Sequence, residues 1–79
     1  MHIPLNSQIV QDWTKSAEII YSFNNEFGEL YVLLKAKNPR GKDIFAVLKF
    51  FSIGDKIQVS QEVPFDDTQE VLISLFRKL

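Results

Sequence analysis

The residues of this 79-residue chain that could carry out acid–base, nucleophilic or metal chemistry form no catalytic set in the sequence. The single histidine, His2, stands at the N-terminus, where chain ends are usually mobile, and there is no cysteine. A Ser-His-Asp or Cys-His mechanism needs a base that is held beside its nucleophile. We therefore predict a protein that is not an enzyme and has no catalytic residues.

A cluster of carboxylates lies near the C-terminus, at Asp66, Asp67 and Glu70. Acidic side chains in the first turn of a helix are stabilised by the helix dipole, which explains the cluster without a ligand. Three hard ligands with no matching second loop would hold a metal ion weakly. The three glycines are scattered like turn residues and form no phosphate-binding pattern. We expect neither a metal nor another cofactor.

Basic residues are concentrated in the middle of the chain. Lysines beside aromatic rings on a sheet can bind single-stranded nucleic acid, because the cations neutralise phosphates and the rings stack on bases. The ordinary alternative is that these lysines keep a hairpin soluble and protect a sheet edge. A formal net charge of −1 adds no overall attraction for phosphate. The candidate nucleic-acid-binding residues are Lys35, Lys37, Arg40, Lys42 and Lys49.

The elements that position these residues are organised around a β-hairpin predicted over residues 29–53. Asn38, Pro39 and Gly41 occupy the places that a type I turn prefers, and Gly41 allows a G1 bulge. This turn sets a register in which one face, here called the core face, is wholly apolar. The pairs expected on the core face are Leu30–Phe50, Val32–Leu48, Leu34–Ala46 and Ala36–Ile44.

The opposite face of the hairpin, here called the outer face, mixes apolar and charged side chains. Its expected pairs are Tyr31–Lys49, Leu33–Val47, Lys35–Phe45 and Lys37–Asp43. If nothing in the chain covers this face, its apolar side chains form an exposed patch of the kind that marks an interface. The candidate partner-binding residues are Ile20, Tyr31, Leu33, Phe45, Val47 and Phe51.

Further strands are predicted on both sides of the hairpin. In the first, the apolar residues alternate, which places Ile19 and Tyr21 beside the core face, whether the turn at residues 24–28 has two or four loop residues. After the hairpin, Gly54 opens a type II′ turn that brings Ile57 and Val59 to the core face. Pro64 is expected to end the last strand. The result is a four-stranded antiparallel meander.

Two helices flank these strands. The first is expected to begin after Asn6 or Ser7 and to end near Lys15 or Ser16. Its Trp13 is expected to be part of a core, either covering the outer face around Leu33 and Val47 or packing on a second copy of the chain.

The C-terminal helix, capped by Asp66 or Asp67, has a broad apolar stripe. The residues of this stripe are Val71, Leu72, Leu75, Phe76 and Leu79. We expect it to cover the core face of the sheet.

The sequence thus predicts one α+β domain over residues 1–79, with a short N-terminal helix, four strands and an amphipathic C-terminal helix packed on one sheet face. The order of elements across residues 17–79 resembles the single-stranded-DNA-binding domain of the transcriptional coactivator family, without implying a role for any residue. No apolar run approaches the roughly 20 residues of a transmembrane helix, and the N-terminus lacks a signal-peptide pattern. No membrane partner is therefore expected, and the absence of cysteine fits a cytoplasmic location.

The first functional hypothesis is a small non-enzymatic protein-interaction module, such as a regulator, an inhibitor or an assembly subunit. Its partner would be another protein or a second copy of the chain bound to the outer face. The alternative is a single-stranded nucleic-acid-binding protein that uses the lysines and aromatic residues of the same face.

Overall fold

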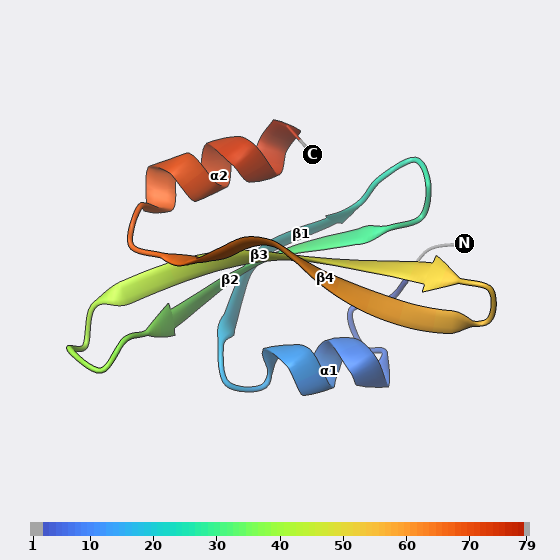
Figure 1. The fold of residues 1–79 in the computed structure, drawn as a ribbon, viewed down its shortest axis with the longest axis horizontal. Helices are drawn as coiled ribbons and strands as arrows, with labels where there is room; N and C mark the ends of the chain where they lie inside the picture. The colour runs from blue at the N-terminus through green and yellow to red at the C-terminus, as the bar shows by residue number, and fades with distance from the viewer. Residues whose placement is uncertain (1–2, 79) are drawn as a thin grey trace.

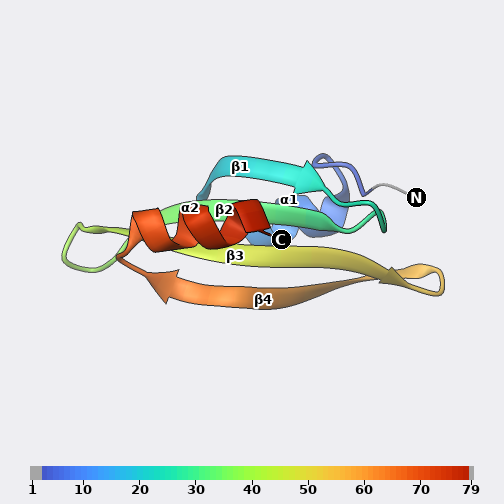
Figure 2. The same cartoon turned by 90° about the horizontal axis from the view of Figure 1, so that it is seen from above.

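The computed structural model describes residues 3–78, and the side chains of residues 3–77; His2 and Leu79 lie outside the described residues. Its elements are α1 (Gln8–Thr14), β1 (Glu18–Asn24), β2 (Leu30–Lys37), β3 (Asp43–Ile53), β4 (Lys56–Asp66) and α2 (Gln69–Lys78). The strands form one antiparallel sheet in the order β1-β2-β3-β4 (Figures 1 and 2). The predicted α+β fold with a meander sheet is therefore confirmed.

The turn between β2 and β3 is built as predicted. Asn38 Oδ1 accepts hydrogen bonds from the backbone N–H groups of Arg40 and Lys42, both at 2.9 Å. Gly41 has a φ of 78°, which a glycine adopts without strain. All four predicted core-face pairs are observed, as are the four outer-face pairs. Local turn chemistry thus fixes the register of the central hairpin.

The turn between β1 and β2 repeats this construction. Asn25 Oδ1 accepts from the N–H groups of Phe27 and Glu29, both at 3.0 Å, and Gly28 has a φ of 80°. The N–H of Asn25 donates to the carbonyl of Glu29, so that three residues form the loop. Loops of two and four residues were expected, and both expectations are wrong because Asn25 and Gly28 together specify a type I turn with a bulge.

A β-bulge at Ile20 interrupts the alternation of side chains between the two faces of the sheet along β1. Ile19 pairs with Leu34, and the next paired residue, Tyr21, lies opposite Leu33. One extra residue in a strand reverses the alternation beyond it. The three-residue turn sets Tyr21 opposite Leu33 on the outer face, so the prediction that Tyr21 joins the core face is wrong, and the bulge returns Ile19 to the core face opposite Leu34. Simple alternation over residues 17–23 does not reveal such an insertion.

The turn between β3 and β4 has a positive φ at Gly54, 63°, and no described residue other than glycine has one. This agrees with the predicted type II′ turn, and the predicted pairs Phe50–Val59 and Ser52–Ile57 are observed.

The last strand, β4, does not end at Pro64, as predicted, but continues to Asp66. A proline is tolerated there because β4 is an edge strand, where one N–H can be missing without breaking the ladder. The β3–β4 pairing also shifts register on both sides of Val47, so that Val63 rather than Glu62 lies opposite Val47. These shifts bring Asp66 opposite Phe45.

The two helices cover opposite faces of the sheet, which is visible edge-on in Figure 1. The core face is covered by α1 and the segment before it, through Val10 and Ile3. The outer face is covered by α2, through Leu72 and Phe76. The expectation that the C-terminal helix covers the core face is therefore wrong. Only two residues separate the end of β4 from the start of α2. The chain therefore turns back directly after Asp66, and α2 packs on the outer face.

Each face carries its own hydrophobic cluster. On the core face the buried residues are Ile3, Val10, Leu30, Val32, Leu34, Leu48 and Phe50. On the outer face they are Tyr31, Leu33, Phe45, Val47, Leu72 and Phe76. Trp13, which was expected to be part of a core, keeps 55% of its surface exposed, because α1 turns Val10 rather than Trp13 toward the sheet. No helix among residues 3–78 is long and apolar enough to cross a membrane.

We expect Gly41→Ala to lower the free energy of unfolding by roughly 1–2 kcal/mol, the cost of holding an alanine in the left-handed region. A methyl group at this position would meet no other atom within 4 Å, so the effect isolates the backbone conformation. Urea titration of both proteins measures it. The neighbouring change Arg40→Ala should alter the free energy of unfolding by no more than about 0.5 kcal/mol. Equal effects of the two changes would contradict the assignment of Gly41 to the left-handed position of the turn.

The assignment of α2 to the outer face predicts which residues are energetically coupled. Phe76 lies in the same cluster as Leu33, whereas Leu34 lies in the cluster on the other face. In double-mutant cycles, Phe76→Leu should couple to Leu33→Val by about 0.5 kcal/mol or more and should be additive with Leu34→Val. The reverse pattern would place α2 on the core face.

Candidate functional site

The chain itself covers most of the predicted partner-binding patch. Tyr31, Leu33, Phe45 and Val47 are buried beneath α2, each with less than a tenth of its surface exposed. The expectation of one exposed patch on the outer face is therefore wrong for these four residues. Phe51 is half-buried, with the Lys49 Nζ 5.3 Å from its ring centroid.

An aromatic cluster forms the contact between α2 and the β1 edge of the outer face. Phe76 meets the rings of Tyr21, Phe23 and Tyr31 edge-on, at centroid distances of 5.1, 4.9 and 6.3 Å. Phe23 stacks on Tyr31 at 5.3 Å. Burial raises the pKa of the Tyr31 hydroxyl, an effect that the nearby Lys49 ammonium partly offsets. Edge-to-face pairs of this kind favour a defined position of the helix on the sheet.

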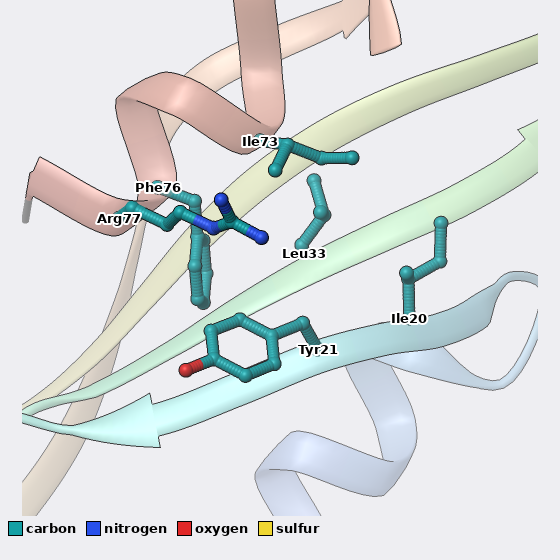
Figure 3. A pocket seen from close by; sticks show the side chains of 6 residues that line it. All are labelled: Ile20, Tyr21, Leu33, Ile73, Phe76 and Arg77. Carbon is teal, nitrogen blue, oxygen red and sulfur yellow. The ribbon is translucent and has the colours of Figure 1, made fainter. Parts of the chain in front are cut away.

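A groove lies between β1 and α2, beside this cluster (Figure 3). Its lining residues are Ile20, Tyr21, Leu33, Ile73, Phe76 and Arg77, and its volume is about 300 Å³. Figure 3 shows β1 residues on one side, α2 residues on the other and Leu33 between them. The lining is almost entirely apolar, and the Arg77 guanidinium provides the one charge, so the groove suits an apolar side chain rather than a polar reactant.

Strand β1 borders this groove and forms one edge of the sheet (Figure 2). Its middle exposes apolar side chains: Ile19 and Ile20 are each 37% exposed and Tyr21 is 52% exposed, while Glu18 and Asn24 lie exposed at its two ends. Because Asn25 donates to Glu29 and direction alternates along a strand, the N–H groups of Ser22 and Asn24 point away from β2.

Within the described part of the chain, no backbone hydrogen bond outside the ladder ends on residues 18–24. The free edge of β1 thus offers unpaired donors and acceptors beside an apolar groove. Of the predicted partner-binding residues, Ile20 and Leu33 are part of this site, because both line the groove. Sequence reasoning missed the edge, although a signal was present: residues 18–24 contain no lysine and no proline, the residues that usually protect an edge.

Four of the five candidate nucleic-acid-binding residues form ion pairs with carboxylates of the same chain. The pairs are Lys35–Glu18 at 3.2 Å, Lys37–Asp43 at 2.7 Å, Lys42–Asp67 at 3.0 Å and Lys49–Glu62 at 3.5 Å. Arg40 lies exposed in the turn between β2 and β3. Because each of the four cations faces a carboxylate, their attraction for phosphates is reduced. Nucleic-acid binding stays a prediction that these pairs make less favourable.

The same pairs shift the ionisation of their members. The hydrogen bond to Glu18, together with the carboxylate charge, raises the pKa of Lys35. The hydrogen bond from Lys37 lowers the pKa of Asp43, and that from Lys42 lowers the pKa of Asp67. All these groups face solvent, so the shifts report stabilised surface pairs and not acid–base machinery.

A second groove, of about 240 Å³, lies on the other side of the sheet between α1 and β4. Its lining residues are Trp13, Ser16, Ala17, Leu34, Leu48, Val59, Gln61 and Phe65. It has no titratable side chain and offers no reactive group. Among the residues whose positions are described, no three His, Cys, Asp or Glu side chains are placed to hold a metal ion.

Comparison with protein-family models, with curated proteins and with solved structures finds no match to this chain.

The ion pairs predict a pH dependence of stability. Asp43 and Asp67 have lowered pKa values in the folded chain. Their contribution to the free energy of unfolding is therefore fully present above the carboxylate pKa of the unfolded chain, about 3.9. It is lost as the pH falls through the lowered values. We expect the melting temperature to decrease below about pH 4, and to decrease less steeply in Asp43→Asn. The control is Asp55→Asn, at a turn residue that forms no ion pair among the described residues and should keep the wild-type slope.

Proposed function

We propose that this protein is a small, non-enzymatic protein-interaction module that binds an extended protein segment along the free edge of β1. A segment of this kind adds a strand to the sheet, with main-chain hydrogen bonds for affinity and alternate side chains for specificity. The observation that supports this proposal is the unpaired edge of β1 (Glu18–Asn24), on which Ile19, Ile20 and Tyr21 are partly exposed. Edges of this composition are normally protected, because they pair readily with other strands.

The opposite edge of the sheet is a poorer docking strand. β4 contains Pro64, which has no N–H to donate, and its pairing with β3 is irregular on both sides of Val47. It also has charged residues along its length, among them Lys56 and Glu62. Irregularities, proline and charge all discourage strand addition. The proposed binding surface is therefore limited to β1.

The groove between β1 and α2 would provide the side-chain specificity. A strand added beside β1 turns every second side chain toward the α2 face. A volume of about 300 Å³ beside Ile20 and Tyr21 suits one large apolar side chain, and Arg77 at the rim suits a neighbouring carboxylate. In this arrangement the buried outer-face residues support the site by holding α2 in position.

This function can be tested by selecting binders from a displayed library of random heptapeptides. Selected peptides should be rich in β-branched and aromatic residues, and Ser22→Pro should weaken their binding at least tenfold in isothermal titration. The proline removes an N–H that points away from β2, so the ladder to β2 stays intact.

The matched control is Ile53→Lys, at an exposed isoleucine in the hairpin between β3 and β4, and it should not change the affinity. A library that gives no binder would contradict the proposal, as would binders that tolerate Ser22→Pro. Both variants should keep the wild-type circular dichroism spectrum, which shows that the fold is retained.

A further inference from the structure

We propose that the segment bound along β1 is β1 of a second copy, so that two chains form one continuous eight-stranded sheet around a two-fold axis. This inference rests on the proposed function and names its partner. It is drawn from the pattern of residues along the edge, which is complementary to itself when one strand is turned antiparallel to the other. A two-fold interface requires this self-complementarity.

Ser22 lies at the centre of the pattern. Its N–H points away from β2, so two Ser22 residues placed opposite each other form a hydrogen-bonded pair that exchanges both N–H···O bonds. This register sets Tyr21 opposite Phe23 of the second copy, and Phe23 opposite Tyr21. The one charged residue of the strand, Glu18, lies at its outer end, so no like charges meet near the axis.

The pairing would extend the aromatic cluster across the axis. Tyr21 and Phe23 both lie on the outer face and contact Phe76. In the proposed register they form a non-hydrogen-bonded pair, the kind in which side chains approach most closely. Tyr21, now 52% exposed, would be covered by an aromatic ring of the other chain.

The difference between the two edges determines the size of the assembly. Pairing of β1 with β4 of another copy would leave free edges at both ends and would continue into fibres. Pro64 and the register shifts around Val47 make β4 unsuitable for that. Pairing of β1 with β1 uses both open edges and stops at two chains. The bulge at Ile20 keeps the regular part short, so we expect a reversible dimer of small interface area.

Sedimentation equilibrium from about 5 µM to about 1 mM protein tests this inference, because a weak dimer must dissociate on dilution. We expect the mass to rise from one chain toward two and not beyond. Ser22→Pro should raise the dissociation constant of the dimer at least tenfold. Tyr21→Ser, which leaves every backbone N–H in place, should also raise this dissociation constant, but by a smaller factor. Ile53→Lys should behave like the wild type.

A cross-link tests the register directly, since the chain contains no cysteine. Paired residues on the axis have Cα atoms about 5.5 Å apart, within the range that a disulfide spans. Ser22→Cys should therefore form a covalent dimer under mild oxidation, and Ile53→Cys should not.

The outcomes separate the two proposals. A wild type that stays monomeric up to the highest concentration overturns the second copy as partner, and so does a dimer that persists in both Ser22→Pro and Tyr21→Ser. In either case, heptapeptides that bind wild type but not Ser22→Pro still support β1 as a docking strand. A monomer that also selects no peptide overturns both.

Discussion

The structure depends on one constraint: the two central strands are apolar on both sides and need a cover on each. Leu33 and Leu34 are neighbours in β2 that point to opposite faces, and both are buried. A sheet with one solvent-exposed face would need a single covering helix, but this sheet needs two. Its short length provides one helix for each face, α1 before the sheet and α2 after it. Little of the chain is left to cover the margins, that is, the two edge strands of the sheet.

The margins are therefore where exposed apolar surface remains. The helices lie over the central strands, so Ile20 and Tyr21 on β1 remain partly exposed, and at the end of this strand Asn24 donates a hydrogen bond to the Ile3 carbonyl. The aromatic contacts of Phe76 position α2 beside this edge and create the groove. Packing that stabilises the fold and geometry that could bind a strand thus arise from the same residues.

The surface charges act mainly within the chain. Each of the four candidate lysines, Lys35, Lys37, Lys42 and Lys49, lies near a carboxylate, and one of the pairs joins Lys42 on the central hairpin to Asp67 before α2. Exposed pairs of this kind add little stability individually, but each carboxylate offsets the charge of its lysine. A partner recognised by backbone pairing and apolar contact fits such a surface better than a polyanion does.

The sequence by itself determined the strands, the central turn and the register of the hairpin, because Asn38 and Gly41 act locally and the alternation around them extends that information along both strands. It did not determine which helix covers which face. That choice depends on the shifts that bring Asp66 opposite Phe45 and on the short link to α2. The three-residue loop between β1 and β2 likewise placed Tyr21 on the outer face, and the bulge at Ile20 returned Ile19 to the core face. Only the tertiary structure decides these points, because one inserted residue reverses a face without changing the local pattern of apolar and polar residues.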